Sequence, residues 1–376
     1  MKIAIIHPFQ FRYGRGIERF TWSLSAALSA RGVQVDLLTW RWPDEVHWGD
    51  LPPRVRVRRV PGFRYFMARA CVPFYLKWLL QGQYDWVMLF FAAYGEAETL
   101  RVLSRLRQQR HCVVFHFPRE QVPHRYREFE RSGLARRADR LIAVSTYVAR
   151  GVQEQFGREC QVIGNGVDPE TFKRSPSARA QMRQKLGIAE SAPVLITLAA
   201  LEERKGVQHV IEAIPALLPD FPDLRYWVLG EGGYRPELEA QIRRLRLEHS
   251  VSLWGNIEDV VSYLAAADIG CLLAYGESFG IAVFEYMAME LPVLVSQHPP
   301  FPELVAPSFG VKVDERDGQQ VVNAIRELLL HPEKRRTMGQ AGRQTVLRQY
   351  TWDHVAEQYL QVLGDSSSGS GPRLMP

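Results

Sequence analysis

Cysteine and long apolar runs are both scarce in this sequence. The 376 residues include four cysteines, at positions 71, 112, 160 and 271, and no Cys-x-x-Cys pair. This spacing gives no support for a zinc ribbon or a thioredoxin-like site. No stretch approaches the roughly 18 consecutive apolar residues of a membrane-spanning helix. The first apolar run, Ile3–Ile6, is too short for a signal-peptide core and predicts a buried strand. We therefore expect a reducing, cytoplasmic setting.

Acidic residues are in deficit only in the first half of the chain. Residues 1–170 hold 26 Lys and Arg against 16 Asp and Glu, a net charge of +10, whereas residues 171–376 hold 21 against 25, a net charge of −4. The composition, 46% hydrophobic and 23% charged, excludes a wholly disordered chain. At roughly 150 residues per domain the length indicates two domains. The basic half should meet an anion, which leaves nucleic acid, phosphates and a membrane surface open.

Short apolar runs alternate with amphipathic segments in two series, which predicts two Rossmann-like α/β domains. The first series opens with a strand at 2–6, a loop, a helix at 17–30 and a strand at 33–38. The second opens at Val194, after a polar, proline-bearing passage over 169–192. This interruption argues against a single (β/α)₈ barrel. The predicted divisions are 1–170, 171–350, a helix at 351–364 that crosses back to the first domain, and a disordered Ser/Gly-rich tail at 365–376.

A glycine pair follows the first predicted strand, in Tyr13-Gly14-Arg15-Gly16. Glycines let the backbone approach a ligand closely, and the N-terminus of the helix that follows offers N–H groups to an anion. The third glycine of a dinucleotide fingerprint is missing, and no acidic residue directly follows the second strand, so NAD binding is disfavoured. A tight turn that binds nothing is the alternative.

A basic pair, Arg204-Lys205, stands between the strand at 194–198 and the next predicted helix. Two cations beside a helix N-terminus at the mouth of a parallel sheet suit a diphosphate. A solvated basic loop would have the same sequence, so this motif alone does not decide between the two interpretations.

A third motif, ESFGIAVFE, contains two glutamates, Glu277 and Glu285, that are separated by seven residues. Carboxylates accept hydrogen bonds from sugar and ribose hydroxyls. The backbone N–H groups of Phe279, Gly280 and Ile281 can serve phosphate or hydroxyl oxygens. A helix cap with one solvated glutamate is the alternative, but it leaves the second glutamate on an apolar helix unexplained.

The ESFGIAVFE segment resembles the E-x7-E signature of the GT4-type retaining glycosyltransferases. Further segments match that family in order along nearly the whole chain. They are the glycine loop at 13–16, the strand ending in His116, Asp139–Ser145, Asn165–Asp168, Glu203–Gly206, Leu229–Gly232, Trp254-Gly255 with Ala267-Asp268, and Leu291–Leu294 followed by Pro302–Leu304. Each match is weak alone, whereas nine in order with compatible spacing are specific.

The resemblance implies the GT-B fold, in which two Rossmann-like domains face each other across a cleft. It implies retaining, metal-independent transfer of a hexose from a nucleotide-diphosphate sugar to a lipid-linked or cell-envelope glycan acceptor, with no cofactor. In the front-face substitution expected of this family, the leaving phosphate itself takes the acceptor proton. Cations and N–H dipoles at the diphosphate then carry the catalysis.

The resemblance also assigns roles to individual residues. His116 and Glu277 would contact the donor sugar, Lys205 and Arg204 the diphosphate, and Glu285 the ribose, while the backbone of Phe279, Gly280 and Ile281 would lie near the sugar, and Gly14 and Gly16 would face the diphosphate or the acceptor. Two departures concern the same region. Ala199-Ala200 stand where the family usually has an arginine, and Pro299-Pro300 replace a glycine pair.

Basic and aromatic residues gather in the first half, over 55–59, 63–69, 72–80 and 124–140. Such segments can bind the anionic inner face of a membrane, which would suit a lipid-linked acceptor. A solvated basic face is the alternative. Two other classes of function stay open: a sugar-nucleotide epimerase or phosphorylase on the same fold, and a non-catalytic protein that binds membranes or nucleic acid. Nucleic acid is not expected as a partner, because no RNP-like, helix-turn-helix or zinc pattern is present.

Overall fold

The chain forms two compact units, seen in a computed structural model that describes residues 1–7, 16–41, 45, 49–60, 68–91 and 109–364. One unit comprises Met1–Gly166 and the chain from Trp352 onward, and the other comprises Val167–Thr351. The chain therefore leaves the first unit after residue 166 and rejoins it at residue 352. The second unit is one continuous segment inserted into the first.

The first unit is built on a parallel sheet, which among the described residues has seven strands in the order β3-β2-β1-β4-β5-β6-β7. The strands are β1 Lys2–Ile6, β2 Gln34–Trp40, β3 Val55–Val60, β4 Trp86–Phe91, β5 Arg110–Phe115, β6 Arg140–Ala143 and β7 Gln161–Val162. The helices are α1 Gly16–Ala30, α2 Ala68–Gly82, α4 Pro123–Ser132, α5 Leu134–Arg137, α6 Thr146–Phe156 and α15 Trp352–Gly364.

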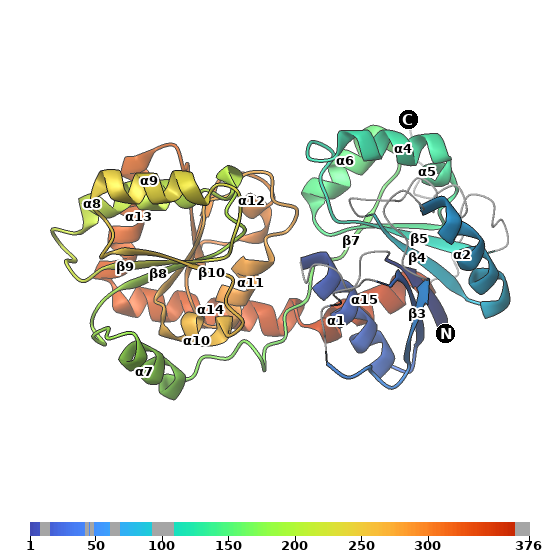
Figure 1. Cartoon of the computed structure of the whole chain (residues 1–376), viewed down its shortest axis with the longest axis horizontal. Coiled ribbons are helices and arrows are strands. Elements are labelled where there is room, and N and C mark those ends of the chain that lie inside the picture. Colours follow the sequence, from blue (N-terminus) through green and yellow to red (C-terminus); the bar gives the residue numbers. More distant parts are fainter. Residues whose placement is uncertain (8–15, 42–44, 46–48, 61–67, 92–108, 365–376) are drawn as a thin grey trace. The chain divides into compact units, whose positions relative to one another are not determined.

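Helices cover both faces of this sheet (Figure 1). Alternate residues of β5 divide between the two faces, as a strand requires. Cys112 and Val114 join the apolar cluster under α1 and α15, whereas Phe115 packs against Phe129 of α4 and Phe156 of α6. The C-terminal helix α15 is therefore part of the core of this unit.

The second unit, of which every residue is described, has a six-stranded parallel sheet in the order β10-β9-β8-β11-β12-β13. The strands are β8 Val194–Leu198, β9 Arg225–Leu229, β10 Val251–Gly255, β11 Ile269–Leu272, β12 Val293–Ser296 and β13 Gly310–Val313. The helices are α7 Pro176–Lys185, the 3₁₀ turn η2 Glu203–Lys205, α8 Val207–Leu217, α9 Arg235–Leu245, α10 Val260–Ala266, α11 Ile281–Ala288, α12 Phe301–Leu304, α13 Gly318–Leu330 and α14 Pro332–Gln349.

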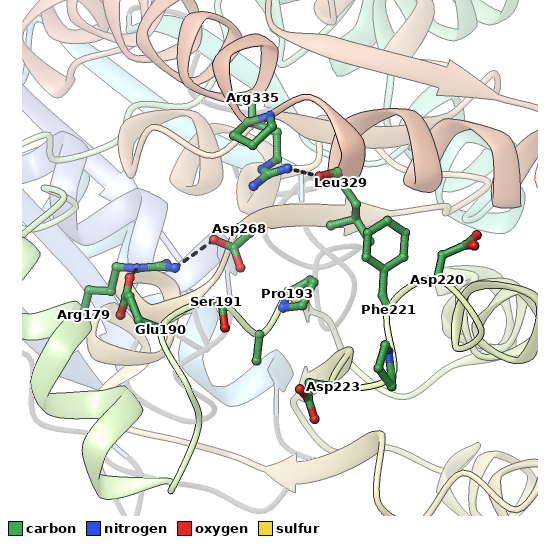
Figure 2. A pocket seen from close by; sticks show the side chains of 13 residues that line it. Arg179, Glu190, Ser191, Pro193, Asp220, Phe221, Asp223, Asp268, Leu329 and Arg335 are labelled. Atoms are coloured by element: carbon green, nitrogen blue, oxygen red, sulfur yellow. Dashed lines mark hydrogen bonds and ion pairs between the residues drawn. The ribbon is translucent and has the colours of Figure 1, made fainter.

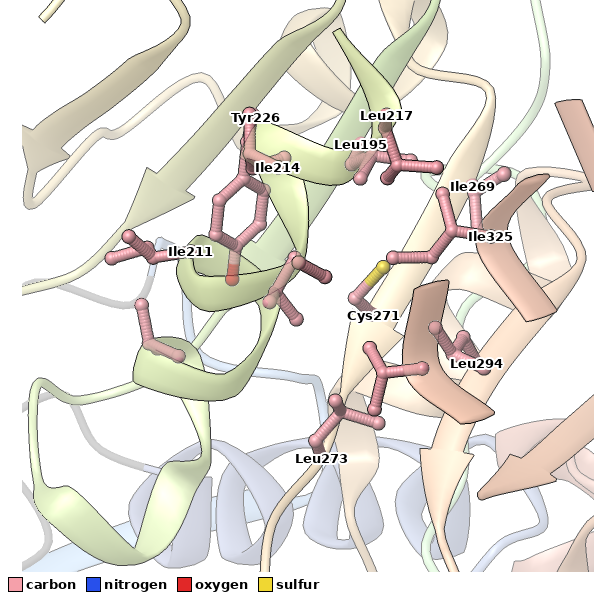
Figure 3. Close-up of a cluster of buried hydrophobic side chains, with 14 of the residues drawn as sticks. Leu195, Ile211, Ile214, Leu217, Tyr226, Ile269, Cys271, Leu273, Leu294 and Ile325 are labelled. Carbon is pink, nitrogen blue, oxygen red and sulfur yellow. The ribbon is translucent and has the colours of Figure 1, made fainter. Parts of the chain in front are cut away.

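The core of the second unit shows the same alternation along β11. Ile269, Cys271 and Leu273 face the layer formed by α8 and α13 (Figure 3), while Gly270, one residue along, faces Tyr286 of α11. On the face of the sheet that packs against α8 and α13, the Thr197 and Tyr226 hydroxyls lie 2.8 Å apart, and Thr197 also donates to the carbonyl of Cys271. The buried polar groups therefore bond to one another, as buried polar groups generally must.

Each sheet reverses its strand order once, between β1 and β4 in the first unit and between β8 and β11 in the second. Parallel strands end at the same edge of a sheet, and ligands of open α/β sheets bind beyond those ends at the reversal. The loops that follow β8 and β11 are therefore where a ligand of the second unit is expected.

The basic segments of the first unit lie in elements that were not predicted from the sequence. Residues 55–59, interpreted as a basic surface segment, belong to the edge strand β3, where Arg58 bonds to Asp36 at 2.9 Å. The basic segments at 72–80 and 124–140 include parts of α2 and the helices α4 and α5. Gly14, residues 63–67 and the tail at 365–376 lie outside the described residues.

Within the described ranges, no helix combines the length and the apolar character that crossing a bilayer needs.

Candidate active site

Lys205 and Glu277 meet at the reversal point of the second sheet. Lys205 ends η2, in the loop after β8, and Glu277 lies in the loop after β11. The Lys205 Nζ donates a hydrogen bond to Glu277 Oε1, and both side chains are largely buried, at 14% and 12% exposure. Arg204 Nη1 lies 3.9 Å from the same oxygen, and its Nε bonds to Glu202 at 2.7 Å. The two cations thus gather around the Glu277 carboxylate where the sheet topology predicts a ligand.

Backbone contacts hold these two loops together. The N–H of Tyr275 donates to the carbonyl of Arg204 at 2.9 Å. Gly206, directly after Lys205, has φ of +71°, and a Cβ there would stand 2.0 Å from the carbonyl oxygen of Leu273. Only glycine fits this crossing, for both its backbone angle and its lack of a side chain. The distance between Lys205 and Glu277 is therefore set by packed backbone.

The segment from Glu277 to Glu285 turns from the loop into α11 at Gly280. Gly280 has φ of +78° and lies against the ring of Phe301. Phe279 is buried and stacks on Phe284, with ring centroids 4.4 Å apart. Its backbone N–H, and those of Gly280 and Ile281, therefore stand at the N-terminus of α11, where helical N–H groups lack intrahelical partners. Glu285, in the second turn of α11, is 7% exposed.

Tyr286 fixes α11 on the sheet, a role that the sequence motifs did not indicate. Its hydroxyl accepts a hydrogen bond of 2.6 Å from the N–H of Leu198, the last residue of β8. Its ring occupies the space that a side chain at Gly270 would need. The only signal in the sequence is its place next to Glu285. His298 and Glu315, which follow β12 and β13 and bond to each other at 2.8 Å, were likewise not among the predicted residues.

His116 follows β5 in the first unit and is 6% exposed. Its ring packs edge-on against Phe20 of α1, with centroids 4.6 Å apart, and near Phe90 of β4. Burial, with a smaller effect from His7, lowers the pKa of His116 to about 3. Its Nε2 is buried and has no hydrogen-bond partner among the described residues. The imidazole is thus neutral near pH 7.

The structure brings together only part of the predicted site. Lys205, Arg204 and Glu277 are in contact, and Phe279, Gly280, Ile281 and Glu285 continue the same segment. His116 and Gly16 belong to the first unit; Gly16 is the first residue of α1, and a Cβ there would have no described atom within 4 Å. Ala199 and Ala200 follow β8 without a charged side chain, whereas Arg204, five residues beyond Ala199, lies beside Glu277.

A hollow of about 430 Å³ lies at the opposite edge of the second sheet (Figure 2). Pro193 and Asp268, which line it, directly precede β8 and β11. Arg179 also lines it, and its guanidinium bonds to Asp268 at 3.0 Å and to Glu190 at 2.6 Å. These charged groups pair with one another, and the hollow lies away from the strand ends that carry Lys205 and Glu277.

Two family descriptions match the chain in the order of its units. Residues 14–171 match Glycosyltransferase Family 4, and residues 178–345 match Glycosyl transferases group 1. The chain belongs to the GT4-type glycosyltransferases. This confirms the family predicted from the E-x7-E motif, and with it an enzyme class.

Solved structures of similar architecture support the fold of this GT4-type chain. The Anabaena protein HepE, solved with UDP and glucose, superposes with a TM-score of 0.81 and 20% identity, over 97% of this chain and all of that one. A sucrose-phosphate synthase from Thermosynechococcus elongatus superposes with a TM-score of 0.79 and 22% identity, over 96% and 98% of the two chains. Together with the two parallel sheets, these likenesses confirm the GT-B fold.

Among curated relatives, a GDP-mannose-dependent monoacylated alpha-(1-6)-phosphatidylinositol monomannoside mannosyltransferase of Corynebacterium glutamicum is 31% identical over 239 residues. That match spans 60% of this chain and 62% of the relative. The phosphatidyl-myo-inositol mannosyltransferase of Mycobacterium leprae is 26% identical over 96% of both chains. This chain thus spans about three fifths of the length of the C. glutamicum relative.

Proposed function

We propose that this GT4-type chain transfers a hexose from a nucleoside-diphosphate sugar to a lipid-linked or cell-envelope glycan acceptor, with retention of configuration and without a metal ion. The observation that carries the proposal is the contact of Lys205 and Arg204 with Glu277 at the reversal point of the second sheet. Cations for a diphosphate and a carboxylate for sugar hydroxyls stand there side by side.

The diphosphate of the donor is the group that these cations suit. As the glycosidic bond breaks, negative charge builds on the leaving phosphate, and groups aimed at that charge lower the barrier. Lys205 and Arg204 offer positive charge, and the N-terminus of α11 at Ile281 adds unpaired N–H groups and the positive end of the helix dipole. These groups would take the place of a metal ion. The leaving phosphate would accept the acceptor's proton, so the chain need not supply a base.

A neutral His116 suits a hydrogen bond to a hydroxyl of the donor sugar. A neutral imidazole carries one donor and one acceptor nitrogen. Because burial keeps the pKa of His116 near 3, its charge state would stay the same across the pH range in which most enzymes work. We propose that it orients the sugar and does not act as a proton shuttle.

A lipid-linked acceptor is supported by the names of the relatives and by exposed groups of the first unit. The relatives from C. glutamicum and M. leprae are named for phosphatidylinositol derivatives. In α4 and α5 the exposed arginines are Arg127, Arg131, Arg136 and Arg137, and α2 exposes Phe74, Lys77 and Leu80. Exposed arginines and exposed apolar side chains are the groups that suit the interface of an anionic leaflet.

Not every arginine of the basic segments can serve this surface. Arg125 is 8% exposed, Arg58 bonds to Asp36, and Arg59 bonds to Glu45 at 2.9 Å. The proposed membrane contact therefore rests on the exposed arginines of α4 and α5. Co-sedimentation with vesicles of phosphatidylcholine alone and with added phosphatidylglycerol tests it. Binding only to the anionic vesicles, lost on Arg131→Glu with Arg136→Glu, is expected; equal binding to both vesicles would refute the electrostatic contact.

The donor class can be found by the thermal unfolding of the full chain with UDP-, GDP- and ADP-sugars. A ligand that binds only the folded state stabilises it by mass action, by about 2.7 kcal/mol at a hundredfold excess over Kd. We expect one nucleotide class to raise the unfolding temperature, and Lys205→Ala to abolish the shift. A chain that no nucleotide sugar stabilises would contradict the proposed function.

A further inference from the structure

A second cluster of polar and aromatic side chains stands beside the proposed donor site and takes no part in its motifs. In the sheet β11 lies between β8 and β12, so the loop that carries Glu277 has the Lys205 loop on one side and the loop after β12 on the other. That second loop carries His298, and the loop after β13 carries Glu315. Both belong to the strand ends where ligands of such sheets bind.

The loop after β12 is tied to the end of β11. The Ser296 hydroxyl donates to the carbonyl of Ala274 at 2.5 Å, and the N–H of His298 points to the same hydroxyl at 3.4 Å. The imidazole of His298 lies edge-on to the ring of Tyr275, with centroids 6.2 Å apart. Tyr275 is 40% exposed and stands two residues before Glu277. The imidazole and the phenol ring therefore border the segment that bears the donor-site carboxylate.

Glu315 holds the imidazole in one orientation. Its Oε1 lies 2.8 Å from His298 Nε2, and only 2% of its side chain is exposed. Because an ionised carboxylate only accepts hydrogen bonds, Nε2 is the donor. His298 Nδ1 has no partner among the described residues, and 39% of this side chain is exposed. The imidazole is thus fixed at one nitrogen and open to a ligand at the other.

The burial of Glu315 is costly if the pair only supports the fold. Its Oε2 is buried without a hydrogen-bond partner among the described residues. A buried carboxylate with one unsatisfied oxygen opposes folding, and such groups concentrate at functional sites.

We propose that Tyr275, His298 and Glu315 form a hydroxyl-recognition subsite for the hexose of the donor. The exposed aromatic ring offers an apolar wall, and the oriented imidazole offers one polar atom, the combination that fixes a small polar ligand in a mostly apolar site. His298 contacts the sugar, while Glu315 acts through His298 as a positioning residue. The inference rests on the proposed function, because it assigns a specificity-determining contact to the donor of that reaction.

The test compares binding of a free nucleotide with binding of the same nucleotide carrying a sugar. The probes are UDP with UDP-glucose and GDP with GDP-mannose, measured by calorimetry on the full chain. His298→Ala should weaken the nucleotide sugar about tenfold, the size of one lost hydrogen bond, and leave the free nucleotide within about twofold. Glu315→Gln should give a smaller loss, and no further loss in the His298→Ala background, because it acts only through that imidazole.

The matched control is His249→Ala, since His249 is exposed and precedes β10 at the opposite edge of the same sheet. It should change neither affinity. A set of donors that each lack one hydroxyl sharpens the test: one of them should bind the wild-type chain and His298→Ala equally.

Three results would overturn the inference. Equal weakening of nucleotide and nucleotide sugar would show a general effect on the site, and no weakening of either would show no contact. Unchanged donor binding with a raised KM for the acceptor would move the contact to the acceptor. A wild-type chain that binds neither nucleotides nor nucleotide sugars would instead refute the proposed function itself.

Discussion

At the scale of single residues, the ion pair between Lys205 and Glu277 makes the carboxylate a competitor of the diphosphate. Glu277 Oε1 accepts from Lys205 Nζ, and Arg204 lies 3.9 Å from the same oxygen. A diphosphate that binds these cations meets a negative charge beside it. Under the proposed function, Glu277 would therefore disfavour the nucleotide part of the donor and would serve only its sugar.

We predict that Glu277→Gln separates these two effects. Free UDP or GDP should bind about fivefold more tightly, corresponding to roughly 1 kcal/mol for one charge pair, while sugar transfer falls. Calorimetry and steady-state kinetics measure the two quantities. Glu170→Gln is the control, because Glu170 pairs with Lys173 on the surface of the same unit. Weaker nucleotide binding by Glu277→Gln would contradict this account of the pair.

The buried His116 predicts a pH effect on stability. Burial lowers its pKa in the folded chain from 6.5 to about 3. The folded chain favours the neutral imidazole of His116. The contribution of this residue to the free energy of unfolding is therefore fully present above about pH 6.5 and is lost as the pH falls towards 3. Between pH 7 and pH 5, protonation of this histidine in the unfolded chain alone lowers the free energy of unfolding by about 2 kcal/mol.

We predict that His116→Phe abolishes that part of the acid loss. Urea unfolding at pH 7 and pH 5 gives the free energy of unfolding of each variant. The decrease between the two values should be about 2 kcal/mol smaller in His116→Phe than in the wild type. The exposed His249 supplies the control, His249→Phe, with the wild-type decrease. Equal decreases in all three chains would show that His116 is protonated in the folded state.

At the scale of elements, comparing Gly206 with Gly187 separates the cost of a steric collision with the backbone from the cost of a positive φ angle. Its φ is +71°, and a Cβ would stand 2.0 Å from the Leu273 carbonyl; Gly187 has φ of +65° with no atom within 4 Å of a Cβ. Both alanine variants suffer from the angle, but only Gly206→Ala forces the Lys205 loop away from β11. We predict that Gly206→Ala costs about 1–3 kcal/mol more than Gly187→Ala.

Urea unfolding measures this difference, and nucleotide binding provides a second measurement. Gly206→Ala should weaken UDP or GDP binding, because Lys205 is the preceding residue, and Gly187→Ala should not. Similar stability and binding in the two variants would mean that the crossing of Gly206 over Leu273 does not set the position of Lys205.

The elements also show what a sequence can and cannot predict. The apolar runs of β1 and β8 predicted those strands with the bounds found, because a strand buried on both faces has a continuous hydrophobic sequence. The strand β3 was missed, because it is an edge strand whose arginines reach outward or bond to Asp36 and Glu45.

The candidate site likewise contains residues that the sequence predicts and residues that only the fold brings together. Lys205, Glu277 and Glu285 stand in short motifs, so local sequence was sufficient to select them. His298 and Glu315 belong to different loops, and only the neighbouring strands β12 and β13 bring them together. No local pattern marks such a pair.

At the scale of the whole molecule, the first unit depends on a helix from the end of the chain. Tyr359 of α15 is fully buried, Trp352 packs edge-on against Phe20, and Trp86 donates to the carbonyl of Leu363 at 3.0 Å. The second unit is a continuous segment with its own core. Loss of packing in α15 should therefore affect one unit alone.

We predict that Tyr359→Ala destabilises the first unit by about 3 kcal/mol or more, the usual cost of a large buried side chain. Hydrogen exchange should rise in α1, β1 and β4 and stay unchanged in β8 and β11. Leu330→Ala removes a leucine that is 57% exposed and should alter neither. Uniformly faster exchange in both units would contradict their independent cores.

The central claim is that Lys205 and Glu277 make the second unit the donor site of a glycosyltransferase. Release of nucleoside diphosphate from UDP-, GDP- and ADP-hexoses tests it most directly, with Lys205→Ala, Glu277→Ala and the surface control Lys173→Ala. We predict turnover of one nucleotide class, a loss of about a hundredfold or more in kcat/KM for Lys205→Ala, a clear loss for Glu277→Ala, and none for Lys173→Ala. Unchanged turnover in both site variants would contradict the account.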